Sequence, residues 1–395
     1  MNVKQIYTLM NTVTNEVLGN SAVVAEDLSN VVDVGVQVFN SSSVDNYVKS
    51  LVNHIGKMVF VDRVYRGSVP SVLMDGWEFG SVLEKVTIDL PEAEINESWE
   101  LEDRSSYDPN VFYKPSVSAK FFNSRVTFEV PISITERQVK QSFSNVNQLN
   151  AFVSMIYNAV EKSLTVKIDA LIMRTINNFT SETLYQDFTA SSTALTSGSG
   201  KRAVNLLYLY NTKFSKNLTV ANCIYDKDFL RFAAYTINIY ISRLRTISTR
   251  YNIGGKDRFT PSDMLHVVML SDFFNGASVY LQSDTFHNEL VKLPKSEIIT
   301  QWQGSGNAND EYPANATINV VNSSGHTINT TGSGGSTQAG ILCVMFDRDA
   351  LGVANMDRRV TTNYNPKAEF FNSWYKYDAG YFNDFNENFI VFFVA

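Results

Sequence analysis

The sequence contains few residues of the kinds that crosslink a secreted chain or hold a protein in a membrane. Only two of its 395 residues are cysteines, and Cys223 and Cys343 lie too far apart to match a metal-ligand spacing. We therefore expect a reduced protein without disulfide bonds. No run of about 18 apolar residues occurs, so the sequence predicts no membrane-spanning helix.

Charge is also scarce, and basic charge most of all. Charged residues make up 18% of the chain and the net charge is −7, whereas a typical chain has about 25% charged residues. There is no basic excess to neutralise a phosphate backbone, which argues against sequence-specific nucleic-acid binding. A low charged fraction fits a subunit whose flanks are covered by neighbouring molecules.

Signals for catalysis or cofactor binding are missing. The stretch TSGSGKR (196–202) lacks the first glycine and the final Ser/Thr of a phosphate-binding loop, since Leu195 and Arg202 occupy those places. The four histidines form no i,i+4 ligand pair, which argues against a zinc site. The sequence therefore predicts neither an enzyme, nor a bound cofactor, nor a metal site.

Two other polar features have ordinary structural interpretations. His266 lies within an apolar strand-like run, where we expect a core histidine with its hydrogen bonds satisfied. Asp347 and Asp349 could mimic a paired-carboxylate catalytic site, but we expect them at a solvated strand end.

Aromatic residues, in contrast, are concentrated at the carboxyl end. Eleven of the 26 residues from Phe370 to Ala395 are aromatic. Chain ends normally fray, so such a segment needs a partner surface. We expect it to form a sheet strand and also a contact surface between subunits, with Phe370, Phe371 and Trp374 as interface candidates.

Two extended runs are joined by a long polar segment in the first half of the chain. Apolar residues alternate from Phe79 to Leu90 and from Val117 to Ile134, with 26 polar, acidic residues between the runs. This pattern predicts a projecting hairpin. A helical period then extends from Val146 to Phe179, which predicts one uninterrupted helix roughly 50 Å long.

The rest of the chain reads as a mixture of helices and strands. A short amphipathic helix is expected at Asp45 to His54, and a Ser/Thr/Gly linker at 189–200. The polar stretch 304–338 predicts a surface loop or a small hairpin insertion. The further expected elements are strands at Leu218–Tyr225, Leu265–Leu270, Gly340–Asp347 and Asn388–Ala395, and helices at Asp226–Ser248 and after Ser271.

Opposite charges gather in two separate segments. Nine acidic and two basic residues lie between Glu84 and Asp108, and five basic residues and one acid lie between Arg243 and Arg258. The simplest interpretation is two solvated faces. A second hypothesis is that the hairpin tip contacts the basic segment of a neighbouring subunit, which would guide register and association rate. The residues assigned to this contact are Glu97, Trp99, Glu100, Arg243, Arg245 and Arg250.

In the order of its parts, the chain resembles the major capsid proteins of tailed bacteriophages with the Hong Kong 97 type fold. It is most similar to those of small podoviruses related to phi29. The local matches are YVKSLVNHIGKMVFVDRVYRG (47–67), GSVLEKVTIDL (80–90), SDTFHNELVKLP (283–294) and the long segment from FDRDALG to GYFNDF (346–385). The likeness in layout covers nearly the whole chain, although its motifs are architectural rather than catalytic.

The resemblance implies an α+β fold with five parts. Residues 1–56 would be an N-terminal arm, and 57–135 an extended hairpin loop with the first strands of a peripheral domain. Residues 136–200 would hold the spine helix of that domain, 201–340 an axial domain with the insertion 304–338, and 341–395 the returning strands.

It also implies a function and partners. The chain would assemble with itself into pentamers and hexamers of an icosahedral shell around double-stranded DNA, without sequence-specific DNA binding and without a membrane. A portal and a separate scaffold protein are expected partners, because the chain shows no long charged, helical N-terminal extension that could act as an internal scaffold. Assembly would occur in the host bacterial cytoplasm, and the protein would reside in the virion.

Two alternatives remain open at this stage. An encapsulin-type nanocompartment shell shares the fold, and gene neighbours would separate it from a phage. A lectin-like or polysaccharide-active β protein would use the aromatic tail as a sugar platform. The single long helix and the missing carboxylate motif count against that second alternative.

Overall fold

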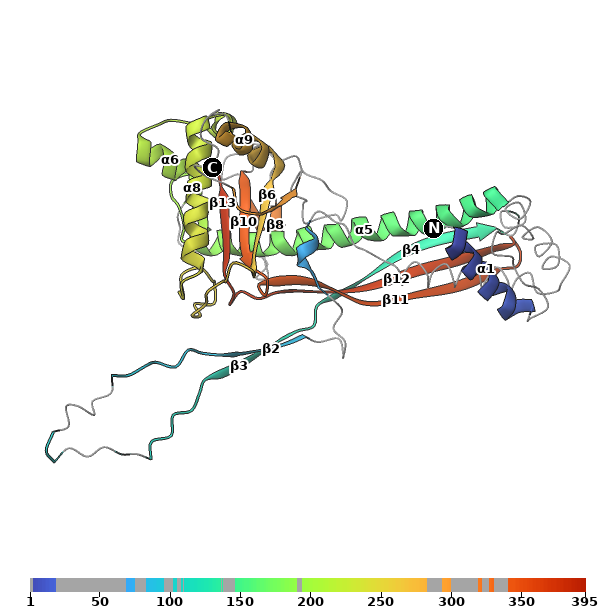
Figure 1. Cartoon of the computed structure of the whole chain (residues 1–395), viewed down its shortest axis with the longest axis horizontal. Coiled ribbons are helices and arrows are strands. Elements are labelled where there is room, and N and C mark those ends of the chain that lie inside the picture. The colour runs from blue at the N-terminus through green and yellow to red at the C-terminus, as the bar shows by residue number, and fades with distance from the viewer. Residues whose placement is uncertain are drawn as a thin grey trace. The chain divides into compact units, whose positions relative to one another are not determined.

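The chain forms a mixed structure of helices and sheets that divides into two compact units. In the computed structural model (Figure 1), unit 1 draws on 1–78, 125–173 and 353–380, and unit 2 on 79–124, 174–352 and 381–395. The structure describes residues 3–18, 69–74, 83–95, 102–104, 108, 110–135, 137, 146–189, 194–282, 293–299, 319–321, 327–329 and 340–395. The predicted helix at Asp45–His54 lies outside these residues.

Unit 1 is built on a four-stranded sheet with the order β1-β11-β12-β4. Its two longest-paired strands, β4 and β12, run antiparallel over eleven residue pairs, from Phe370 opposite Thr135 to Gly380 opposite Arg125. The strand bounds are β1 Leu73–Met74, β4 Arg125–Thr135, β11 Leu351–Asn365 and β12 Phe370–Asn383.

The alternating pattern of β12 separates an apolar face from a polar face. Tyr375 and Tyr377 lie on the buried face, while the opposite face carries cross-strand polar pairs. On that face Ser133 donates to Asn372 at 2.6 Å and Lys376 pairs with Glu129 at 3.5 Å. Period-two alternation in β4 and β12 therefore places the predicted apolar residues on one side of the sheet.

Two helices begin in unit 1. α1 covers Val3–Leu18, and α5 covers Val146–Leu184, a continuous helix of 39 residues. The buried residues of α5 recur every four positions at Ile156, Val160, Leu164 and Ile168, as expected for one face of a helix. The predicted helix is thus confirmed, and it continues five residues past Phe179 before a π-helical turn, Tyr185–Thr189.

Unit 2 contains a five-stranded sheet with the order β5-β13-β10-β6-β7. Its central strands β10 and β13 are buried along their whole length. In Figure 1 the helices α6, α8 and α9 lie around this sheet, and α6 contacts β13 while α9 contacts β6 and β7. The bounds are β5 Ala203–Asn205, β6 Leu265–Leu270, β7 Glu297–Ile299, β10 Ile341–Asp347, β13 Phe389–Phe393, α6 Leu206–Phe214, α7 Val220–Cys223, α8 Lys227–Leu244 and α9 Ser271–Gln282.

The carboxyl-terminal strand is locked into this sheet. β13 pairs antiparallel with β10 and parallel with β5. Its aromatic side chains contact residues from distant segments: Phe389 stacks on Phe179 with ring centroids 4.0 Å apart, and Phe393 meets Phe188 edge-on at 5.6 Å. Burial within the chain therefore accounts for this end of the aromatic tail.

Several predicted elements match the structure, and others differ from it. The strand Leu265–Leu270 and the helix after Ser271 are confirmed as β6 and α9. Leu218–Tyr225, predicted as a strand, instead contains α7, because Thr219 and Asn222 form a reciprocal capping box at its start. In the polar stretch 304–338, the described residues form a small antiparallel hairpin, β8 (Asn319–Val321) and β9 (Thr327–Asn329).

The predicted run from Val117 to Ile134 is two strands rather than one. β3 (Val117–Phe122) and β4 belong to different sheets and are separated by Asn123 and Ser124. The break allows β3 to pair with β2 (Leu83–Ile88) while β4 pairs with β12.

We expect Phe392→Ala to lower the free energy of unfolding by about 3–5 kcal/mol, because the change leaves a cavity in a packed core. Phe392 is fully buried and meets Tyr240 with ring centroids 5.3 Å apart. Urea denaturation of the unassembled chain measures the loss. Phe112→Ala is the matched control, since Phe112 is 83% exposed, and it should change the value by less than about 0.5 kcal/mol. Equal losses in the two variants would contradict this assignment of the core.

Candidate functional site

The two-stranded hairpin of unit 2 has its polar and apolar faces in an unusual arrangement. Its inner face, which is half-buried against unit 2, is mostly polar and carries Leu83, Lys85, Thr87, Ser118, Lys120 and Phe122. Its outer face is exposed and mostly apolar, with Glu84, Val86, Ile88, Val117, Ala119 and Phe121. The hairpin thus turns most of its apolar side chains away from the rest of unit 2.

Lys85 fastens the inner face to unit 2. Its ammonium group donates three hydrogen bonds of 2.9 Å each, to the Asp349 carbonyl, to Asp384 Oδ2 and to Glu387 Oε1. All three N–H donors of the ammonium are therefore satisfied. Lys120, directly opposite Lys85 in the strand register, donates to Asp384 Oδ1 at 3.0 Å.

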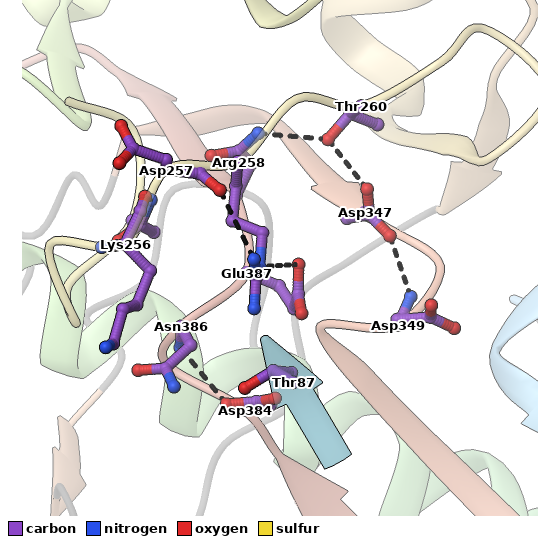
Figure 2. Close-up of polar contacts among 12 residues, drawn as sticks. Thr87, Lys256, Asp257, Arg258, Thr260, Asp347, Asp349, Asp384, Asn386 and Glu387 are labelled. Carbon is purple, nitrogen blue, oxygen red and sulfur yellow. Dashed lines mark hydrogen bonds and ion pairs between the residues drawn. The ribbon is translucent and has the colours of Figure 1, made fainter. Parts of the chain in front are cut away.

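The carboxylates that receive these lysines lie on the turn between β12 and β13, residues 384–388 (Figure 2). The turn is held by backbone bonds: the Asp384 N–H donates to the Ala350 carbonyl at 2.7 Å, and the Gly254 N–H donates to the Phe385 carbonyl at 2.8 Å. A side chain at Gly254 would collide with Asn386 Oδ1, so this close approach requires glycine. The acceptors are thus positioned by the fold itself.

Arg258 completes a cluster that we call the anchor, formed by Lys85, Lys120, Arg258, Asp384 and Glu387. The Arg258 Nε lies 3.3 Å from Glu387 Oε2, a contact drawn in Figure 2. The anchor therefore joins the hairpin, the 384–388 turn and the loop before β6. Next to it, Phe122 and Phe382 pack with ring centroids 5.3 Å apart.

The charges of the anchor shift the pKa values of its members in the directions expected for ion pairs. Burial alone would lower the pKa of Lys85, but hydrogen bonding to Asp384 and the charges of Glu387 and Asp384 raise that pKa above 10.5. Burial would raise the pKa of Asp384, but its bonds with Lys85 and Lys120 hold that pKa below 3.8. Both groups are therefore charged at neutral pH.

A second, more exposed contact holds the next part of the hairpin. Lys256 Nζ lies 2.7 Å from Asp89 Oδ1, and Ser116 donates to the other oxygen of Asp89 at 2.8 Å. The hydrogen bond from Lys256 lowers the pKa of Asp89. Beyond this point the described residues of the hairpin, 90–95 and 110–117, are exposed.

Asp347 lies close to the anchor and is not the solvated residue that the sequence predicted. Its carboxylate is buried, accepts from Thr260 Oγ1 at 2.7 Å and from the Asp349 N–H at 3.0 Å, and burial raises its pKa. The prediction failed because the residues that hold Asp347 come from remote parts of the chain. Thr260 donates to Asp347, and Asn388 donates in turn to Thr260. Asp349 itself is half-buried.

His266 is also different from its prediction. It is stacked on Phe346 with ring centroids 5.6 Å apart, as expected for a core position. Its Nε2, however, is buried without a hydrogen-bond partner in the described part of the chain, and burial lowers its pKa. The prediction that the hydrogen bonds of His266 are satisfied is therefore wrong for Nε2 among the described residues.

The structure describes some of the predicted interface residues and not others. Glu97, Trp99 and Glu100 lie outside the described residues. Arg243, Arg245 and Arg250 are all exposed, and we call them the arginine patch.

The arginine patch keeps its charge available for a partner. Arg243 lies over the Tyr240 ring, 5.0 Å from its centroid. Neither Arg245 nor Arg250 forms an ion pair with a described residue. The other two basic residues of the same segment, Lys256 and Arg258, are instead occupied by Asp89 and Glu387. The predicted basic segment is thus divided between contacts inside the chain and a free surface.

The aromatic candidates divide in a similar way. Phe371 is buried in unit 1 and packs on Tyr364 with ring centroids 4.6 Å apart, so it belongs to the core. Phe370 and Trp374 lie on the opposite face of β12 and are partly exposed.

A search of the described residues finds no group of acidic, cysteine or histidine side chains placed to hold a metal ion. Within those residues there is also no helix with the length and apolarity needed to cross a membrane.

A family model matches residues 10–393, nearly the entire chain, and its description is Phi29-like phage major capsid protein. The chain belongs to this family. It is therefore a shell protein of a tailed-phage capsid, which is a structural role. The match does not favour the alternative of an encapsulin-type shell. A comparison with curated proteins finds no match.

Solved phage structures are similar to this capsid protein. The capsid structure of Staphylococcus phage Andhra matches with a TM-score of 0.50 and 11% identity, covering 85% of this chain and 86% of that one. A structure of head fiber and inner core protein gp22 of native bacteriophage P68 matches with a TM-score of 0.47 and 12% identity, over 85% and 86% of the two chains. At such identities the likeness concerns the fold alone.

Sequence reasoning did not identify the anchor. Lys85 was counted only as one of two basic residues in an acidic segment, and Asp384 and Glu387 were not singled out. A signal did exist, since Lys85 and Lys120 occupy the polar face of two alternating strands. Alternation, however, does not tell which face turns toward the body of the protein.

We expect Lys85→Met to lower the free energy of unfolding by about 3 kcal/mol, the lower end for breaking a buried ion pair, because Lys120 and Arg258 still face the carboxylates. Lys120→Met is the matched control. The Lys120 side chain is 41% exposed against 19% for Lys85, so its loss should cost at most about 1 kcal/mol. Denaturant titrations of both variants test this, and the reverse order would contradict the anchor.

We expect Asp384 to make the free energy of unfolding decrease as the pH falls. Because its folded-state pKa lies below 3.8, Asp384 adds stability above that pH, and this stability is lost as the pH falls through the folded-state value. Asp384→Asn should remove this slope. Asp347, whose pKa is raised, should contribute the opposite slope, which Asp347→Asn removes. Urea titrations between about pH 2 and pH 6 measure both slopes. Unchanged slopes in the variants would contradict these assignments.

Proposed function

We propose that copies of this chain assemble into pentamers and hexamers that close an icosahedral shell around double-stranded DNA. The observation that carries the proposal is the outer face of the hairpin, whose apolar side chains are left largely uncovered by the part of the chain that the structure describes. Val86, Ile88, Val117 and Phe121 are all more than half exposed. Water contact of this extent is unfavourable, and a neighbouring copy would remove it.

The family's architecture supports names for the parts. On this proposal the fold is of the Hong Kong 97 type, with 1–56 as the N-terminal arm, the hairpin as the extended loop and α5 as the spine helix of a peripheral domain. Residues 201–340 would form the axial domain around the symmetry axes. The order of these elements along the chain is what supports the assignment.

The composition suits a container rather than a DNA-binding protein. With a net charge of −7, the shell would enclose the genome without gripping its phosphates. Each contact between copies can be weak, because many contacts act together in a closed assembly. A portal and a separate scaffold protein would be its partners, with assembly in the host cytoplasm and residence in the virion.

We further propose that the acidic tip of the hairpin contacts the arginine patch of a neighbouring copy. The exposed acids of the described tip include Glu92, Glu94, Glu102 and Asp103. In the sequence, Glu97 and Glu100 lie between Glu94 and Glu102, on either side of Trp99. Complementary charges raise the association rate and fix the register more than they raise affinity. Phe370 and Trp374 are proposed as a further contact between subunits.

Electron microscopy of the purified protein tests the shell. We expect closed shells or rings of five and six copies. A chain that stays a monodisperse monomer at all concentrations and salt conditions would overturn the proposed function.

Charge reversal tests the contact between tip and patch. R243E/R245E/R250E should slow assembly at low salt by about tenfold or more and remove its salt dependence, because steering by opposite charges is lost. Adding E97K and E100K to this variant should restore much of the rate. The control K201E/K216E/K367E makes the same change in net charge at exposed lysines elsewhere. An equal effect of the control would show that net charge alone matters.

A further inference from the structure

The orientation of the hairpin contradicts what hydrophobic burial alone would select. Turned over about its long axis, the hairpin would bury Val86, Ile88 and Phe121 on the rest of unit 2 and would expose its lysines together with Leu83 and Phe122. In the structure the apolar side chains face outward, with Phe121 64% exposed and Ile88 61% exposed. Some other interaction must therefore fix the orientation.

The anchor is that interaction. Lys85 finds three acceptors on the inner side, and its partner Asp384 is almost completely buried, at 1% exposure. An unpaired carboxylate at such a depth would be strongly unfavourable. Turning the hairpin over would leave Asp384 and Glu387 without these lysines, so the carboxylates hold the polar face inward.

Formation of the hairpin also depends on the anchor. Lys85 and Lys120 are directly opposite each other across the two strands, and like charges in this position destabilise strand pairing. An isolated two-stranded hairpin is at best marginally stable in water. Asp384 accepts from both lysines and so removes the repulsion. Pairing of β2 with β3 and docking of the pair on unit 2 therefore support each other.

We propose that the anchor determines which face of the hairpin is presented to the neighbouring copy in the proposed shell. The inference rests on the proposed function. Lys85 is the positioning residue: it makes no contact with the second copy but decides that Val86, Ile88, Val117 and Phe121 meet it.

The charges of the hairpin and the family of the chain indicate that the molecule docked on the outer face is a second copy of this chain. The outer face carries a single charged residue, Glu84, among apolar ones, so it suits a protein surface rather than a charged ligand. The acidic hairpin beyond it complements the arginine patch exposed on every copy. Chains of this family are capsid proteins, whose structures are assemblies of subunits.

Single cysteines on the two faces report the orientation. Val86→Cys places a thiol on the outer face and Thr87→Cys one on the inner face. The chain's own two thiols do not interfere: both are buried, and burial raises the pKa of Cys223 to about 12 and that of Cys343 still further. Maleimide labelling is then followed before and after shell assembly.

In the unassembled chain, Val86→Cys should react about tenfold faster than Thr87→Cys, since thiol reactivity follows exposure. After assembly the reaction of Val86→Cys should fall to the level of Thr87→Cys, because the second copy covers it. Equal labelling of the two positions before assembly would overturn the inference.

A neutral anchor tests the positioning role. The variant K85M/K120M/D384N/E387Q removes both lysines together with the two carboxylates that they bind. Arg258 is then the one charged member of the anchor that remains, and its side chain is 19% exposed. We expect the difference in labelling between positions 86 and 87 to vanish and assembly to slow at least about tenfold, one decade per about 1.4 kcal/mol of lost positioning. Protection of Cys343 from labelling should persist and show that unit 2 remains folded.

The control K201M/K216M/D228N/D272N neutralises as many exposed charges elsewhere and should label and assemble like the wild type. A neutral-anchor variant that labels and assembles like the wild type would overturn the positioning role of Lys85. Shells in which Val86→Cys still reacts freely would overturn the docking surface while the proposed function stands. A wild-type chain that forms neither shells nor rings would overturn the proposed function and this inference together.

Discussion

A buried ammonium group must find an acceptor for each of its protons, and this requirement governs how the chain presents itself to other copies. Lys85 meets it with one carbonyl and two carboxylates that lie about 260 to 300 positions further along the sequence. Turning the hairpin over would separate those charges and leave Asp384 and Glu387 without their lysines. The hairpin consequently keeps an apolar face in water until another molecule covers it.

Stability and assembly thus draw on different parts of the molecule. The aromatic carboxyl-terminal strand β13 and the long helix α5 are buried within the chain and stabilise its fold. The hairpin is fixed to unit 2 through the anchor and offers its outer face to a partner. This division is consistent with the low charged fraction of the chain. Part of the apolar surface is buried only when a folded subunit meets another copy.

The periodic elements could be predicted from the sequence, because their patterns are local. The helix period predicted α5, and the alternation from Val117 to Ile134 predicted which side chains of β4 share a face. The strand predicted at Leu218–Tyr225 failed because a local capping box at Thr219 and Asn222 favours a helical turn. The single run Val117–Ile134 failed because alternation continues across a change of sheet.

The candidate site was harder to predict, because its members are distant in sequence. Alternation in β2 and β3 separates lysines from apolar residues but does not say which set faces inward. That choice depends on Asp384 and Glu387, which look like ordinary turn residues in the sequence. Asp347 was likewise misjudged, since only folding brings Thr260 to its carboxylate. Buried ion pairs are contacts between remote residues, and no local pattern reports them.

A reconstruction of the assembled shell at side-chain resolution tests the central claim most directly. The account predicts that Phe121 and Ile88 of each copy lie in van der Waals contact with a neighbouring copy, while Lys85 still binds Asp384 and Glu387 of its own chain. A shell in which the outer face of the hairpin lies against its own unit 2, or remains in solvent with Lys85 detached, would contradict it.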